Sequence, residues 1–285
     1  MNVVKTKSCF VCRKNNITFF GKRNGYDYFK CNDCSTIQLN PLPSEEQLTL
    51  LYEKQYSKSG HHDTSPSKSE LLKQYLWNDI KLAVTRYLPK GSRVLDYGAG
   101  WGGLCKLLNR NNFQCEAVDQ SEEMAAYCRD VGIFITLGDL DSFPDQTFDA
   151  IVMCTVFEHL INHDEWLKKA HTKIKQNGLL ISLQPTAHFA SFAGTILKKS
   201  GELPDLNGAF SAPWHTGLIS CKGMQILAER NRFKIIEIAM ASNTRREGLV
   251  GILLRFIEAV NRIAYPIFKD RWPLVICHTF VFRKR

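Results

Sequence analysis

The sequence predicts an α/β protein, in which a mostly parallel sheet carries helices on both faces and a small cysteine-bearing module comes first. From about residue 68 onward, short apolar runs alternate with amphipathic segments, as in successive β-α units. The stretch "VLDYGAGWGG" at 94–103 passes from a buried strand into a glycine-rich turn. Four cysteines near the start form two Cys-x2-Cys pairs. The 285 residues suffice for one such domain and a small appendage.

The N-terminal module covers residues 1–40. Cys9 and Cys12 form the first pair, and after an 18-residue gap Cys31 and Cys34 form the second. This is the spacing of a zinc ribbon, where two knuckles bring four thiolates to one tetrahedral ion. A redox dithiol is the alternative, but two matched pairs argue against it. We expect a structural zinc ion in a module too small to bury its own core.

A helix and a linker are predicted between the module and the main domain, over residues 41–67. Ser44 and Gln47 resemble a capping box, which indicates the start of a short helix. The polar stretch 57–69 contains glycine, serine and proline and is typical of a linker. The main domain is therefore expected over 68–285.

The main domain is predicted to begin with a helix over about 69–88. The strands that follow are expected, in chain order, at "SRVLDY" (92–97), "FQCEAVD" (113–119), "IFITLGD" (133–139), "FDAIVMCT" (148–155), "GLLISLQP" (178–185), "FKIIEIAMA" (233–241) and "LVICHTFVFRK" (274–284). Two insertions, 186–217 and 245–272, interrupt the alternation. The last two strands are expected to form a hairpin with a helical insert.

The glycine turn fits the patterns of two cofactor classes. A dinucleotide site, G-x-G-x-x-G, is matched by Gly98, Gly100 and Gly103. An S-adenosylmethionine site, D-x-G-x-G-x-G, is matched by Asp96, Gly98, Gly100 and Gly102. The carboxylate of Asp96 would repel a pyrophosphate but suits the ammonium and sulfonium groups of S-adenosylmethionine, and this favours the second pattern.

The chain resembles the class I S-adenosylmethionine-dependent methyltransferases over about 68–285. The matching motifs occur in the family's order: "VLDYGAGWG", "AVDQS", "GDLDSFP", "FDAIVMCTVFEHL" and "NGLLISLQP". The resemblance implies a Rossmann-like, seven-stranded methyltransferase sheet. It also implies that the methionine part of the cofactor faces Asp96, Gly98, Ala99, Gly100 and Gly102, that Asp119 and Gln120 hold the ribose, and that Asp139 and Leu140 flank the adenine with Cys154 and Thr155 below.

Methyl transfer to oxygen or nitrogen needs a base, and the first candidate is His159. It lies in "VFEHL" at the carboxyl end of the fourth strand, where ligands bind in open α/β sheets. The pair Glu158-His159 also marks a subfamily, so a structural role is the alternative. His215, at the end of the insertion 186–217, is the second candidate. The insertion itself is expected to cover the acceptor.

The expected acceptor is a small molecule: a sugar, a lipid-linked sugar or a secondary metabolite, methylated on oxygen, nitrogen or carbon. The N-terminal zinc module is similar to one in some bacterial methyltransferases of this type. An RNA methyltransferase is the alternative, because the net charge of +9 is concentrated in the first 60 residues and in 222–285. The stretch "CTVFEH" lacks the proline-containing loop of nucleic-acid amine methyltransferases, so nucleic acid is not favoured.

The sequence predicts a cytoplasmic protein, because residues 1–8 are polar and an apolar run of about 20 residues is missing. The segment 247–268 is predicted to be a helix with a narrow polar stripe, made of Glu247, Gly251, Arg255, Glu258 and Arg262. We favour burial of its apolar side against the domain. A homodimer interface and a peripheral membrane contact are the alternatives.

Overall fold

The computed structural model describes residues 7–44, 46–47, 65–206, 208–243, 247–269 and 272–285. Its main sheet has seven strands in the order β10-β11-β8-β7-β4-β5-β6. The strands are β4 (Arg93–Tyr97), β5 (Gln114–Asp119), β6 (Ile135–Leu137), β7 (Phe148–Cys154), β8 (Ile174–Pro185), β10 (Phe233–Met240) and β11 (Cys277–Lys284). Among these seven strands, β11 runs in the direction opposite to the other six. The predicted α/β fold and the terminal hairpin are confirmed.

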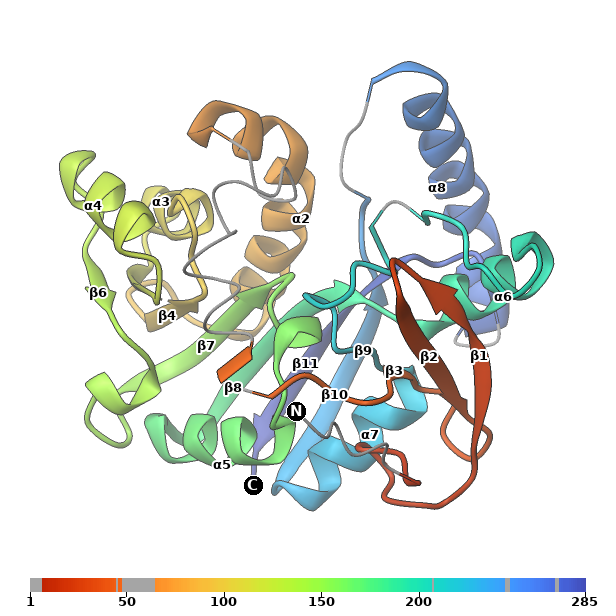
Figure 1. Cartoon of the computed structure of the whole chain (residues 1–285). Helices are drawn as coiled ribbons and strands as arrows, with labels where there is room; N and C mark the ends of the chain where they lie inside the picture. Colours follow the sequence, from red (N-terminus) through yellow and green to blue (C-terminus); the bar gives the residue numbers. More distant parts are fainter. Residues whose placement is uncertain (1–6, 45, 48–64, 207, 244–246, 270–271) are drawn as a thin grey trace.

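Helices cover both faces of the main sheet, because successive residues of its central strands point to opposite sides. On β7, Ala150 and Val152 join one core, and Ile151 and Met153 join the other. Figure 1 shows α2 and α3 above the sheet and α5 and α7 below it. The helices are α2 (Pro66–Tyr87), α3 (Gly103–Arg110), α4 (Glu122–Asp130), α5 (His163–Lys173), α6 (Ala187–Leu197), α7 (Cys221–Arg230) and α8 (Gly248–Phe268), with 3-10 turns η1 (Leu140–Ser142) and η2 (Phe157–His159).

Side-chain caps fix where several of these helices begin. Ser65 accepts a hydrogen bond from the backbone N of Lys68, and Pro66 occupies the first turn of α2. This start lies three residues before the predicted one. Ser121 caps α4 and Asn162 caps α5 in the same way. The hydrogen bonds of the predicted capping box between Ser44 and Gln47 are present, and residues 48–64, over which a helix was expected to continue, lie outside the described residues.

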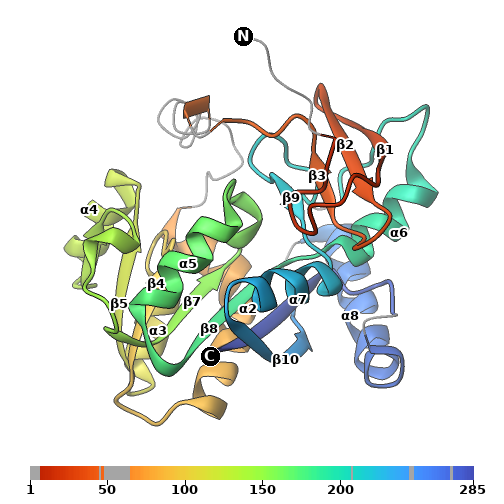
Figure 2. The same cartoon turned by 90° about the horizontal axis from the view of Figure 1, so that it is seen from below.

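The second sheet has four strands in the order β1-β2-β3-β9. The N-terminal module supplies β1 (Ile17–Arg23), β2 (Tyr26–Cys31) and β3 (Ile37–Leu39). The fourth strand, β9 (Gly217–Leu218), follows the first insertion and pairs antiparallel with β3. Figures 1 and 2 both show this sheet beside α6. The module thus completes its sheet with a strand from the main domain.

A third core joins the N-terminal module to the first insertion. Phe20 and Tyr28 of the module pack with Ala193 of α6 and with Phe210 in the chain after it. Gly194 leaves room for this contact, since a Cβ there would lie 3.0 Å from the ring of Phe20. The insertion therefore has two sides, one packed on the module and one available to the cavity described below.

The orientation of α8 corrects our expectation that its apolar side is buried. Glu258 and Asn261 face inward and are 5% and 2% exposed, whereas most of the large apolar side chains of α8 point to solvent. The inward polar side chains find specific partners. The Asn261 amide donates to Leu274 O at 3.0 Å, and its Oδ1 accepts from Trp272 Nε1 at 2.7 Å. Among the described helices, none is long and apolar enough to cross a bilayer.

Candidate active site and metal centre

A cavity of about 1290 Å³ opens at the carboxyl ends of β4, β5 and β7. A pocket for one drug-sized ligand has about 300–1,000 Å³, so this cavity has room for two ligands side by side. One half is formed by the glycine turn and α2, and the other by η2 and the first insertion. Nine of the predicted cofactor residues line it: Asp96, Gly98, Ala99, Gly100, Asp119, Gln120, Asp139, Cys154 and Thr155.

The glycines of the turn serve two different purposes. Gly100 has a φ of 55°, and a Cβ added there would find one atom within 4 Å, the Sδ of Met124 at 3.7 Å. It leaves the cavity open beside the backbone. Gly103 lies against the ring of Trp77, which a Cβ would meet at 2.1 Å. The glycine that completes the dinucleotide pattern is thus required for the packing of α3 on α2.

Asp96 is buried at the inner end of the cavity, with an exposed fraction of 2%. Its Oδ2 accepts a hydrogen bond from the backbone N of Cys105 at 3.1 Å. Burial raises the pKa of Asp96 to about 7, and the charge of Lys73 partly opposes this shift. A buried carboxyl of this kind is stabilised in its charged form by a cationic ligand, as the S-adenosylmethionine pattern requires.

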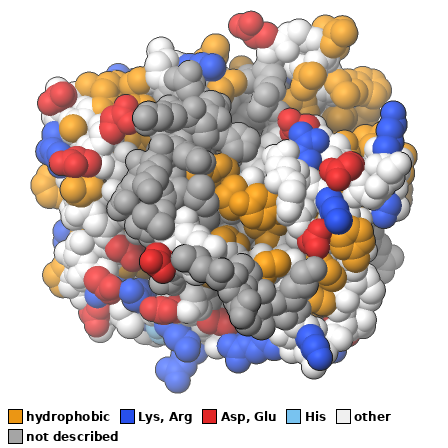
Figure 3. Space-filling view, in the orientation of Figure 1, with side chains coloured by type: hydrophobic (Ala, Val, Ile, Leu, Met, Phe, Trp, Pro, Cys, Tyr) orange, Lys and Arg blue, Asp and Glu red, His pale blue; other side chains and the backbone are white. Residues whose placement is uncertain are grey.

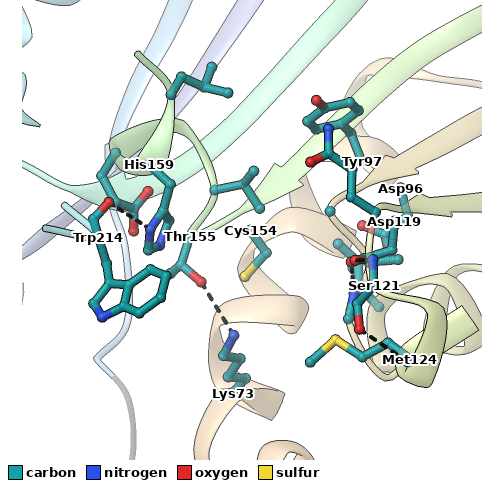
Figure 4. A pocket seen from close by; sticks show the side chains of 18 of the residues that line it. Lys73, Asp96, Tyr97, Asp119, Ser121, Met124, Cys154, Thr155, His159 and Trp214 are labelled. Carbon is teal, nitrogen blue, oxygen red and sulfur yellow. Dashed lines mark hydrogen bonds between the residues drawn. The ribbon is translucent and has the colours of Figure 1, made fainter. Parts of the chain in front are cut away.

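Asp119 links the glycine turn that follows β4 to the turn that follows β5, at the carboxyl ends of these strands. Its Oδ2 accepts from Gly100 N at 2.8 Å, and its Oδ1 accepts from Ser121 N at 2.9 Å. Burial raises the pKa of this carboxyl as well. Figure 4 shows Asp119 and Ser121 on the same side of the cavity as Asp96. Asp119 is fixed by two backbone groups where a ribose would bind.

Asp139 follows β6 and caps η1. Its Oδ1 accepts from the hydroxyl of Tyr97 at 2.8 Å and from Leu140 N at 2.7 Å.

Two predicted residues are not on the cavity wall. The side chain of Leu140 is fully buried in the core beneath the sheet, and Gly102 packs against Ile133 as the N-cap of α3.

Thr155 has a backbone conformation that is unusual for a β-branched residue, with a φ of 56°. Its N donates to Leu183 O at 2.7 Å, and Lys73 Nζ donates to its hydroxyl at 3.4 Å. Figure 4 shows Lys73 reaching toward Thr155 from α2.

Lys73 and Trp77 line the cavity but were not predicted, because the sequence of α2 contains no motif. Trp101 lines it too and packs edge-on against Tyr127.

The two predicted catalytic histidines lie together on the acceptor side of the cavity. His159 Nδ1 is 3.0 Å from Trp214 O, and His215 Nδ1 is 3.0 Å from Ala209 O. A carbonyl oxygen can only accept, so each Nδ1 carries the hydrogen and each Nε2 has the lone pair in the neutral ring. The two ring centroids are 4.8 Å apart. The geometry provides two nitrogens that can take a proton.

Glu158 completes this group. It is 2% exposed, it lines the cavity, and its Oε2 has no hydrogen-bond partner within the part of the chain that the structure describes. Burial raises its pKa to about 8. The ligand atoms of Glu158, His159 and His215 all lie within 4.8 Å of one another. Such a set can move a proton or hold a divalent cation.

The four N-terminal cysteines meet at one point. Sγ of Cys9 is 3.6 Å from that of Cys34, and Sγ of Cys12 is 3.5 Å from that of Cys31. A tetrahedral zinc ion with bonds of 2.3 Å requires separations of about 3.8 Å, so the four sulfurs fit it. The hydrogen bond from the Cys9 thiol lowers the pKa of Cys34, and a thiolate is the form that binds metal.

The cysteine centre is attached to the main domain by direct hydrogen bonds. The hydroxyl of Ser220, the N-cap of α7, donates to Cys34 O. Arg230, at the other end of α7, donates to Val11 O at 2.6 Å and pairs with Asp164 at 2.7 Å. These bonds hold the module against α7, in addition to the pairing of β3 with β9.

We expect one zinc ion per protomer, because four converging cysteines, three of them buried and Cys12 half-buried, supply a complete ligand set. Replacement of Cys9 by serine should remove the metal and lower the melting temperature, since the ion links the two knuckles. Cys115→Ser is the matched control, a buried cysteine outside the cluster that should keep the zinc. The measurement is metal analysis together with thermal unfolding. Freshly purified, reduced protein without zinc would contradict the expectation.

Comparisons with known proteins identify the family of the main domain. The sequence profile of a family described as "Methyltransferase domain" matches residues 71–232. The ubiquinone biosynthesis O-methyltransferase of Bradyrhizobium diazoefficiens is 31% identical over 116 residues, which are 38% of this chain and 45% of that protein. The cyclopropane-fatty-acyl-phospholipid synthase of Escherichia coli is 31% identical over 102 residues, 33% of this chain and 26% of that protein. The chain thus matches less than half the length of either relative.

Solved structures share the fold. PH0226 protein from Pyrococcus horikoshii superposes with a TM-score of 0.55 at 18% identity, covering 81% of this chain and 99% of its own. A SAM dependent methyltransferase from Archaeoglobus fulgidus gives a TM-score of 0.51 at 17% identity, covering 74% of this chain and 97% of its own. The seven-stranded, Rossmann-like sheet predicted for the main domain is confirmed.

Proposed function

The chain belongs to the S-adenosylmethionine-dependent methyltransferases, and from this premise we propose that it methylates a hydroxyl or an amine of a small molecule: a sugar, a lipid-linked sugar or a secondary metabolite. The observation that carries the proposal is the pair of histidines on the acceptor side, each with its Nδ1 held by a carbonyl. An acceptor with an O–H or N–H bond needs a base, whereas an activated carbon acceptor does not.

The shape of the cavity supports a small acceptor. Residues of the first insertion, including Leu206 and Trp214, form the wall opposite the glycine turn. Thr216 ties this insertion to η2, because its N donates to Glu158 O at 3.0 Å and its hydroxyl donates to Leu160 O at 2.6 Å. One relative is named as an O-methyltransferase of ubiquinone biosynthesis, which also supports an oxygen acceptor.

The residues of the chain divide the work between the two halves of the cavity. S-adenosylmethionine, when bound, supplies a methyl group on a sulfonium. Asp96 would balance its positive charges, and Asp119 would bind the ribose hydroxyls. On the other side, Nε2 of His159 accepts the proton of the acceptor as its oxygen or nitrogen becomes nucleophilic. Glu158, with a pKa of about 8, is mostly protonated at neutral pH and can donate a hydrogen bond to the acceptor.

Transfer of a labelled methyl group from S-adenosylmethionine tests the proposal. The acceptors offered are pools of nucleotide sugars, lipid-linked sugars, quinone precursors and total RNA, all prepared from one culture of cells. We expect label in a small-molecule or lipid-linked fraction, on oxygen or nitrogen. Label confined to RNA would overturn the proposal in favour of an RNA methyltransferase, and label on carbon would overturn the assignment of a base.

A further inference from the structure

We propose that α8 docks the protein onto an anionic lipid surface. The outward face of this helix exposes large apolar side chains along its whole length. Their exposed fractions run from 50% to 85%, and they belong to Leu249, Val250, Ile252, Leu253, Phe256, Ile263, Ile267 and Phe268. Figure 3 shows hydrophobic side chains gathered at the upper right of the molecule, over α8. A continuous apolar face of this kind marks an interaction surface.

Polar contacts on the inner side hold α8 in this orientation. Asn261 uses both ends of its amide, on Leu274 O and on Trp272 Nε1. The hydroxyl of Tyr265 donates to Ile238 O, on the strand that precedes the helix. Rotation of the apolar face toward the protein would leave these groups without their partners and would bring Glu258 to the surface. The exposed apolar face is therefore a fixed property of the fold.

The charges on the exposed face select the occupant. Arg255 is exposed within α8 and Lys269 follows its last turn, whereas the exposed Arg262 pairs with the buried Glu258 at 3.1 Å. The acidic Glu247 is exposed as the N-cap, at the opposite end of α8 from Lys269. Apolar side chains mixed with cations are typical of a helix that lies in the interface of a bilayer with anionic head groups. A symmetric dimer through this face is the alternative that the experiment below distinguishes.

The position of α8 places the cavity near the docking surface. The segment that joins β10 to α8 reaches the cavity wall at Asn243. Figure 1 shows α8 on the same face of the sheet as α2, which forms another part of that wall. A protein bound through α8 would hold its acceptor half close to the head groups. This last step, unlike the docking itself, rests on the proposed function. Among the acceptors proposed there, a lipid-linked sugar is the one that fits a protein bound to a lipid surface.

Sedimentation with lipid vesicles tests the docking. We expect the wild type to sediment at low salt with vesicles that contain phosphatidylglycerol, and to bind phosphatidylcholine vesicles at least tenfold more weakly. High salt should weaken the binding, because exposed charges are screened. Phe256→Glu should lower the binding at least tenfold. Phe134→Glu is the matched control, because Phe134 is 69% exposed and Phe256 is 66% exposed, and Phe134 lies beside β6, away from α8.

Three outcomes would overturn the docking. The wild type could remain in the supernatant, or Phe134→Glu could release the protein as fully as Phe256→Glu. The third is a wild-type protein that is dimeric and does not bind vesicles, and that Phe256→Glu converts to a monomer. This result would show that the face is an interface between copies of the chain. Vesicle binding is measured without an acceptor, and calorimetry with S-adenosylmethionine confirms that each variant is folded. Failure of the docking is thus distinguishable from failure of the proposed function.

Discussion

Replacement of His159 by asparagine should lower the turnover of methyl transfer about 10²–10⁴-fold, with unchanged affinity for S-adenosylmethionine. The amide nitrogen of asparagine can replace Nδ1 and donate to Trp214 O, so the loop keeps its hydrogen bond. Asparagine has no atom that can take a proton at the position of Nε2. Turnover with saturating acceptor and calorimetry with S-adenosylmethionine measure the two quantities.

The alanine variant separates the two roles of this ring. His159→Ala removes both the base and the bond to Trp214 O. If His159 only positions Trp214, the asparagine variant should be active and the alanine variant should not. Equal loss in both variants supports the base. A wild-type rate in both would contradict it, and His215→Asn would then show whether the second ring takes the proton.

Replacement of Gly100 by valine should abolish the binding of S-adenosylmethionine in calorimetry. The backbone of Gly100 borders the cavity, and its φ of 55° directs a new side chain into space that is open except for Met124. A branched side chain would fill the place of the methionine part. The positive φ adds backbone strain of about 1–3 kcal/mol, which should lower the melting temperature.

A second glycine separates this strain from the loss of space. Gly132 has a φ of 75°, a Cβ there would meet nothing within 4 Å, and it is not on the cavity wall. Gly132→Val should therefore lower the melting temperature by a similar amount and leave binding intact. Binding that survives in Gly100→Val, or that is lost in both variants, would show that the glycine turn does not receive the cofactor as we describe.

The parts of the site that could be predicted are those that local sequence determines. The strand at Asp96, the turn at Gly100 and the cysteine pairs each follow from neighbouring residues, and the structure places them as expected. Lys73 could not be found in this way. It reaches the cavity only because α2 packs across the sheet, and the sequence of α2 contains nothing that distinguishes this lysine from those on a solvated face.

The prediction of how α8 is oriented was wrong for a related reason. The pattern of apolar residues identified the helix and its two sides correctly, but it did not show which side faces the protein. That choice depends on Trp272 and Leu274, which lie beyond the helix and offer partners to Asn261. Burial of apolar area alone favours the opposite orientation, so specific hydrogen bonds decide the outcome here.

The pairing of β9 with the sheet of the N-terminal module has a consequence for biosynthesis. The bond between Ser220 and Cys34 joins residues 186 positions apart, and β9 pairs with β3 over a similar separation. At about 5–20 residues per second, a ribosome completes β9 roughly ten to forty seconds after it makes the cysteines. During that interval β3 has an unpaired edge, and Phe20 and Tyr28 lack the insertion residues that cover them, so the nascent module exposes both a strand edge and apolar side chains.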